Sequence, residues 1–245
     1  MGRYFLDLEF TNGNYYLADI IELALLAEHS GNTFHSYVRI HYLIPTRVKE
    51  LTNINDDLLV TAGCSFKDTI ASLSAFLHEE QKQSDTQPII IAHAGFLFDF
   101  PILFANFMKH KIMQLNVFKE CLFADSLQIF KDNGHKQRLG LDSLCQQFGL
   151  MRCTHSAIDD VRLLRTVFQG QPIGTSYTFD EIMFNLHKKL PVPIARVYAW
   201  ARKCQSSKDL EVMLTKFITA KTALNRYQMF KIAHWYFKDR YVMCK

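Results

Sequence analysis

The chain has 245 residues, of which 49% are hydrophobic and 21% are charged, a balance that indicates a globular protein and excludes a disordered one. This length suits one large domain, or one domain with a smaller appendage. No apolar run reaches the roughly 18 residues of a membrane span. The N-terminus runs directly into a predicted strand and does not resemble a signal peptide.

The net charge of +4 is divided unevenly along the chain. Residues 1–170 contain 15 Lys and Arg against 19 Asp and Glu, whereas residues 171–245 contain 13 against 5. An acidic front part and a basic tail indicate two different roles. The tail could attract a polyanion such as nucleic acid, or it could be the solvated surface of a helical region.

Cysteine usage gives an expectation for the compartment. The 6 cysteines are scattered and include no Cys-x-x-Cys pair: Cys64, Cys121, Cys145, Cys153, Cys204 and Cys244. This spacing predicts free thiols in a reducing intracellular compartment, the cytoplasm or the nucleus, rather than a disulfide framework or a zinc site.

The front part begins with a meander of antiparallel strands. Segment 3–10 reads as a strand, a turn follows at 12–14, and apolar runs at 17–27 and 33–40 continue the pattern. The next segment, 43–59, reads as a loop with short helical turns.

The following segments alternate between helices and strands. A helix is predicted at 65–80 from its apolar period and from Ser65 and Asp68, which resemble a capping pair. Further strands are predicted at 88–94 and 121–127, and further helices at 98–110, 139–150 and 157–170. Strands that alternate with helices after a meander indicate an α/β domain with a mixed sheet.

The tail is predicted to be helical. Residues 171–177 have the composition of a linker, and residues 178–245 contain four candidate helices. Aromatic and basic residues interleave there, which suits single-stranded nucleic acid; the alternative, which we favour for most of the aromatic residues, is that they form the region's own core. We therefore expect a domain at 1–170, a linker at 171–177 and a basic helical region at 178–245 that contacts nucleic acid or a protein partner.

Two acids interrupt the first predicted strand, whose sequence includes FLDLEFTNG. Asp7 and Glu9 are two residues apart, so a strand directs both carboxylates to one face. Two like charges on an otherwise apolar strand are unfavourable unless something positive lies between them.

Two more acids are predicted to approach the interior. Asp99 lies near the start of the helix at 98–110, in line with its apolar face, and Asp160 is followed at helical spacing by apolar residues. Asp159 aligns instead with Arg162 and is predicted to face solvent. Carboxylates gathered in an interior need a cation, and Mg²⁺ or Mn²⁺ prefers such oxygen ligands.

One histidine completes the candidate site. His155 precedes Asp160 by five residues, and a histidine can deprotonate an attacking water near neutral pH. Each motif alone has an ordinary explanation, as a surface strand, a helix N-cap or a capped helix. A catalytic role is favoured over these explanations because all the motifs occur together, in order, in suitable strand and helix contexts.

In this order the motifs resemble the DEDDh family of 3′→5′ exonucleases, which includes proofreading subunits and three-prime repair exonucleases. FLDLEFTNG resembles the first motif, IIIAHAGFLFDFPIL the second and HSAIDDV the third, and RLGLDSLCQQFGL resembles the segment before the third. The resemblance covers residues 1–168. It implies a ribonuclease H-like α/β fold, a mixed five-stranded sheet with flanking helices, to which this chain would add a C-terminal all-helical region.

The resemblance also implies roles for individual residues. Asp7, Glu9, Asp99 and Asp160 would hold two Mg²⁺ ions, with Mn²⁺ as a substitute, and His155 would be the general base.

Four further residues would contact the substrate: Phe10, Thr11, Ala94 and Phe98. Phe10 and Thr11 would lie against the 3′-terminal nucleotide. Many relatives have Asn where this chain has Ala94, so the polar contacts of that amide are expected to be missing. Phe10 replaces a smaller residue of many relatives and is expected to change how the terminal base stacks.

The function that follows is metal-dependent 3′→5′ exonucleolysis of nucleic acid, with single-stranded DNA ends favoured, releasing nucleoside 5′-monophosphates. Two alternatives stay open. The substrate could be RNA, or the chain could be a catalytically silent nucleic-acid-binding or adaptor module. Retention of the four acids and the histidine argues against the silent module.

Overall fold

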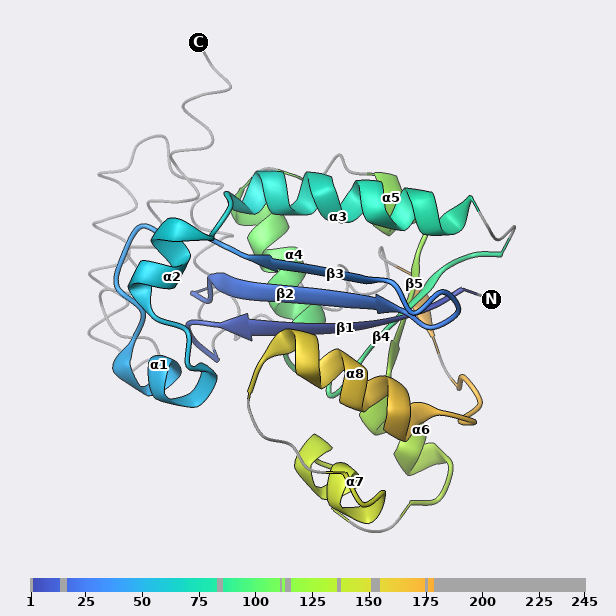
Figure 1. The fold of residues 1–245 in the computed structure, drawn as a ribbon. Coiled ribbons are helices and arrows are strands. Elements are labelled where there is room, and N and C mark those ends of the chain that lie inside the picture. Colours follow the sequence, from blue (N-terminus) through green and yellow to red (C-terminus); the bar gives the residue numbers. More distant parts are fainter. Residues whose placement is uncertain are drawn as a thin grey trace, which may run out of the picture. The chain divides into compact units, whose positions relative to one another are not determined.

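The computed structural model describes residues 2–13, 17–82, 86–110, 112, 116–135, 138–150, 155–174 and 176–178. These residues form a mixed six-stranded sheet in the order β3-β2-β1-β4-β5-β6 (Figure 1). The strands are β1 (Arg3–Phe10), β2 (Ile20–Ala27), β3 (Thr33–Tyr37), β4 (Ile89–Ala92), β5 (Leu122–Asp125) and β6 (Tyr177–Thr178). β1, β4 and β5 run parallel in the centre, while β2, β3 and β6 pair antiparallel with their neighbours.

Helices cover both faces of this sheet (Figure 1). One face carries α3 (Phe66–Gln81), α4 (Asp99–Lys109) and α5 (Asn116–Lys119), and the other carries α6 (Ser126–Asp132), α7 (Leu141–Gln147) and α8 (Ala157–Phe168). Two short helices follow β3: α1 (Thr46–Thr52) and α2 (Asp56–Thr61). Ile54, between them, and Leu59 of α2 form a small cluster with Ile21 at the start of β2.

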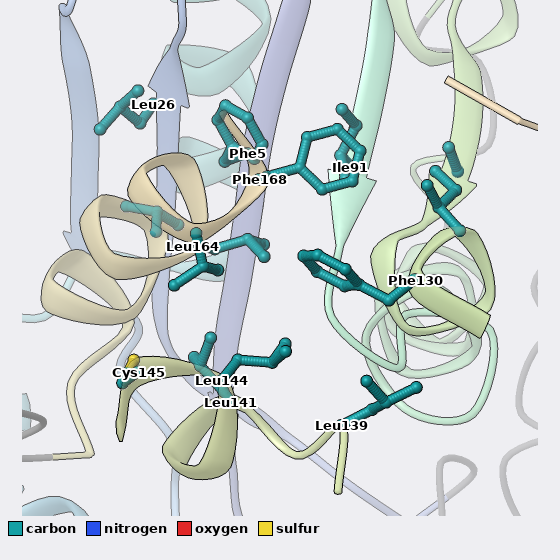
Figure 2. Packing of buried hydrophobic residues seen from close by; sticks show 14 of the residues in the cluster. Phe5, Leu26, Ile91, Phe130, Leu139, Leu141, Leu144, Cys145, Leu164 and Phe168 are labelled. Carbon is teal, nitrogen blue, oxygen red and sulfur yellow. The ribbon is translucent and has the colours of Figure 1, made fainter. Parts of the chain in front are cut away.

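The two faces of β1 have separate cores. Phe5 points to the face of α8, where its ring meets Phe168 edge-on at 5.8 Å, within the cluster drawn in Figure 2. Leu6 and Leu8 are buried on the opposite face. Asp7 and Glu9 follow Phe5 at alternate positions of β1 and therefore lie on the same face, the face of α8. The apolar core on this face thus ends in carboxylates towards the carboxyl end of the strand.

Local signals explain where several helices begin and end. Ser65 accepts a hydrogen bond from the Asp68 amide at 3.1 Å and caps α3, as its sequence predicted. Pro101 lies in the first turn of α4, where the absence of an amide proton costs nothing. Gly149 and Gly170 follow α7 and α8 with positive φ, the conformation that commonly terminates a helix.

The ribonuclease H-like α/β prediction is confirmed, with two differences. The sheet has a sixth strand, β6, whose two residues pair with Leu122 and Phe123. The segment 121–127, predicted as one strand, leaves the sheet at Asp125 and continues as α6, because the Asp125 carboxylate accepts the Leu127 amide at 2.9 Å and caps a helix there.

The chain divides into two units, 1–182 and 183–245. The four helices predicted beyond residue 178 lie outside the described residues, and the predicted linker, 171–177, ends within β6. Among the described helices, none is both long and apolar enough to cross a membrane. The described cysteines, Cys64, Cys121 and Cys145, form no disulfide.

Candidate active site

The predicted site residues gather at the carboxyl ends of the parallel strands. Asp7 and Glu9 lie in the second half of β1, the loop 93–98 follows β4, and α4 begins at Asp99. Because β1 and β4 are parallel neighbours, their carboxyl ends share one edge of the sheet, the usual place for a site in α/β folds. The pairing of β1 with β2 shifts register between Glu9 and Phe10, a kind of bulge that often re-aims side chains beside a site.

Three of the predicted residues form a compact cluster. One ligand atom each of Glu9, His155 and Asp160 lies within 4.8 Å of the other two. Asp160 is only 2% exposed, whereas Asp159 turns to solvent and pairs with Arg162 at 3.3 Å. The helical period of α8 thus separates the two adjacent aspartates as the sequence predicted.

Asp7, on β1, and Asp99, the first residue of α4, are not part of this cluster. Asp7 is partly buried, one side-chain repeat before Glu9. Asp99 is buried, and its Oδ1 accepts a hydrogen bond from the amide of Leu8, between the two strand acids, at 3.2 Å. Asp99 is therefore tied to the middle of the Asp7–Glu9 motif.

Burial controls the protonation of Asp99. The pKa of Asp99 is raised to about 8, chiefly by loss of hydration. The neighbouring carboxylates Asp125 and Asp160 also act to raise this pKa, and backbone hydrogen bonds act to lower it. A divalent cation would provide the opposite effect, because a positive charge favours the ionised form. The donor set, carboxylate oxygens from two strand residues and two helix N-termini, fits Mg²⁺ or Mn²⁺.

This pKa shift predicts how the metal-free protein responds to pH. A raised pKa means that the folded state binds the Asp99 proton more tightly than the unfolded state. Stability from this group is therefore present at low pH and is lost as the pH rises from about 3.8 through about 8. We expect Asp99→Asn, measured in chelator, to lack this decline in melting temperature, while Asp159→Asn follows the parent. A decline of equal size in Asp99→Asn would contradict the assignment.

Two of the predicted substrate contacts form an aromatic pair. The rings of Phe10 and Phe98 stack with centroids 6.4 Å apart, and Phe98 is 43% exposed. A half-exposed ring next to the carboxylates offers a stacking surface for a base. Thr11 is buried instead, and its hydroxyl accepts the Asp19 amide and bonds the Tyr42 hydroxyl, both at 3.0 Å. The Thr11 hydroxyl is therefore occupied by the loop after β1 and by the segment after β3.

The loop after β4 has an unusual backbone at Ala94. This residue has φ of 55°, a left-handed conformation that Gly and Asn adopt far more readily than Ala. The next residue, Gly95, packs so closely that a Cβ would lie 2.7 Å from the Phe100 ring and 2.8 Å from the Ala92 Cβ. The loop that leads to Asp99 is thus tightly constrained, and Ala94 is strained within it.

Relieving that strain should stabilise the protein. We expect Ala94→Gly to raise the free energy of unfolding by about 0.5–1 kcal/mol, because Gly adopts positive φ without a Cβ clash. The matched control is Ala92→Gly, in the buried strand β4, which should be destabilised. Chemical denaturation of both variants checks the difference, and a loss of stability in Ala94→Gly would show that its φ is not strained.

Two buried acids near the site were missed at the level of sequence. Asp125 ends β5, is 5% exposed, and accepts the Phe96 amide at 3.1 Å, which holds the loop before Asp99; burial raises its pKa. Glu22 lies on β2 directly opposite Glu9 and is 1% exposed. The available signal for both was an acid within, or at the end of, an apolar strand.

Comparisons with known proteins bear on the family and the fold of this chain. The family model for exonucleases, RNase_T, matches residues 4–168. The fold is similar to the crystallographic structure of the nuclease domain of 3′hExo, a DEDDh family member bound to rAMP, with a TM-score of 0.60 and 16% sequence identity over 73% of this chain and 97% of that one. A search of curated proteins gave no match. The family model covers most of the chain, including the three motifs, and the chain therefore belongs to the exonuclease family.

Proposed function

We propose that the protein is a metal-dependent 3′→5′ exonuclease that releases nucleoside 5′-monophosphates from nucleic-acid ends. The observation that carries the proposal is the convergence of Glu9, His155 and Asp160 within 4.8 Å, beside Asp7 and Asp99, in a chain of the exonuclease family. Bound to the four carboxylates, two Mg²⁺ ions would neutralise the scissile phosphate and lower the pKa of an attacking water.

The protein's own side chains account for the remaining steps. His155, partly exposed at the entrance to α8, can accept the proton of the attacking water. Attack on phosphorus breaks the bond to the 3′ oxygen of the preceding nucleotide, so the phosphate stays on the released one. The stacked Phe10 and Phe98 rings support a role in holding the terminal base in line.

The direct test is an oligonucleotide labelled at its 5′ end. With Mg²⁺ or Mn²⁺ it should shorten one nucleotide at a time, and chelator should abolish the shortening. The matched control is the same strand with a blocked 3′ end, which should resist. Internal cuts, or equal cutting of the blocked strand, would contradict the proposed polarity.

We favour DNA as the substrate and keep RNA as the alternative. The RNA alternative is supported by the rAMP bound to the similar 3′hExo nuclease domain. DNA and RNA strands of identical sequence, single- and double-stranded, separate these cases. No cleavage of any of them would instead favour the silent binding module.

The basic tail is proposed to strengthen substrate binding. Residues 171–245 carry 13 basic against 5 acidic residues, and each phosphate neutralised on a single strand adds about 0.7 to the slope of log K against log salt. We expect charge reversals at Arg202, Lys203 and Lys231 to weaken oligonucleotide binding and to make that slope shallower, with cleavage of a dinucleotide unchanged. Reversal of Lys82, an acid-paired lysine of the exonuclease domain, is the control. An unchanged slope would favour a role in packing or in partner binding.

A further inference from the structure

We infer that Glu22 is a positioning residue, whose carboxylate fixes the start of α8 and thereby the place of His155 and Asp160 opposite Glu9. The inference rests on the proposed function and adds to it a residue outside the three motifs. Glu22 is the charged residue of β2, whose other positions are apolar and buried. At 1% exposure, such a carboxylate is unfavourable unless hydrogen bonds satisfy it.

Three donors satisfy the Glu22 carboxylate. Its Oε2 accepts the backbone amide of Ala157 at 3.0 Å, and its Oε1 is 3.2 Å from the Ser156 hydroxyl and 2.7 Å from His35 Nε2. Two of these donors belong to the start of α8 and the third to β3. Glu22 therefore joins the antiparallel side of the sheet to the helix that carries the third motif.

This arrangement replaces the local cap of α8. Ser156 occupies the N-cap position but its side chain makes no capping hydrogen bond to the helix, and its hydroxyl turns to Glu22 instead. The first amides of a helix have no partner within it, so a carboxylate from another strand can satisfy one. Its negative charge also interacts favourably with the positive end of the helix dipole.

The tie has direct consequences for the candidate active site. His155 precedes the bonded Ser156–Ala157 pair, and Asp160 follows it within one helical turn. Glu22 and Glu9 are cross-strand partners whose side chains project to the same face, about 5 Å apart at Cβ. Glu22 thus sets how far the helix-borne residues lie from the strand-borne Glu9, and displacements near 1 Å can cost about 100-fold in rate.

Two substitutions at Glu22 test the inference by kinetics. Glu22→Gln keeps one acceptor oxygen but loses the charge, and we expect kcat to fall about 10-fold with KM nearly unchanged. Glu22→Ala removes both acceptor oxygens, and we expect its kcat to fall about 100-fold. The control for a loss of stability alone is Val167→Ala, in the last turn of α8, which should lower the melting temperature but keep kcat at temperatures well below it.

A second readout does not depend on nuclease activity. In Glu22→Gln we expect hydrogen exchange at the amides of residues 157–160 to become at least several-fold faster, a larger increase than in the rest of α8. We also expect the affinity of this variant for Mn²⁺ to fall. In Val167→Ala, the first turn of α8 should exchange at the rate of the parent once the lower global stability of the variant is taken into account. If the parent does not cleave nucleic acid, the proposed function fails, and exchange and Mn²⁺ affinity still decide the role of Glu22.

The outcomes divide clearly. Faster exchange in the first turn of α8, together with a kcat loss that is larger in Glu22→Ala than in Glu22→Gln, supports a positioning role. If Glu22→Ala does not fold, the results for Glu22→Gln decide alone. Parent-like exchange and Mn²⁺ affinity in Glu22→Gln, or a kcat loss that Val167→Ala reproduces at the same drop in melting temperature, would overturn the inference.

Discussion

Asp160→Asn should lose more than about 100-fold in activity, whereas Asp159→Asn should remain close to the parent. The two residues are adjacent in sequence, yet α8 buries the first beside Glu9 and His155 and turns the second to solvent with Arg162. Mutation of a residue that hydrogen-bonds to a metal ligand commonly lowers activity or metal affinity about 10–100-fold, so loss of a ligand itself should lower activity more. Asp7→Ala and Asp99→Asn should resemble Asp160→Asn.

The comparison is informative because the fold should survive in each variant. Removing one carboxylate from a crowded site lowers like-charge repulsion, so the metal-free variants should be as stable as the parent or more stable. Single-turnover cleavage and thermal unfolding in chelator measure the two effects separately. Equal losses of activity at positions 159 and 160 would show that the helical face does not determine which aspartate acts.

His155→Ala should reduce the rate about 10²–10⁴-fold, the usual contribution of a general base. The imidazole lies within 4.8 Å of the carboxylates of Glu9 and Asp160, a distance compatible both with a base beside the ions and with a ligand. We predict the first role, so Mn²⁺ affinity should change little in His155→Ala.

Calorimetric titration of Mn²⁺ into the His155→Ala variant separates these roles. The Asp160→Asn variant is the matched comparison, because it should lose affinity together with rate. If His155→Ala loses Mn²⁺ affinity to the same extent, the histidine is a ligand, and the proton acceptor must be sought elsewhere.

The residues that could be predicted from the sequence are those whose placement is local. A strand period of two places Asp7 and Glu9 on one face, and a helical period of 3.6 distinguishes Asp160 from Asp159. Neither argument needs a distant partner. The same applies to the Ser65 cap and to the proline in the first turn of α4.

The residues that could not be predicted depend on distant partners. Asp125 matters because it accepts the Phe96 amide of another loop, and Glu22 because it bonds a helix 135 residues later in the chain. Likewise, the consequence of Ala94 in place of Asn became clear only from its positive φ. Period and propensity describe a single element, whereas these features arise where elements meet.

The most direct test of the account is a crystal structure with Mn²⁺ and a nucleoside 5′-monophosphate, using anomalous scattering to locate the ions. The account predicts Mn²⁺ at the carboxyl end of β1, ligated by Asp7, Glu9, Asp99 and Asp160, with the phosphate on the ions and the base against Phe10 and Phe98. Mn²⁺ bound elsewhere, or no Mn²⁺ at these carboxylates under saturating conditions, would contradict it.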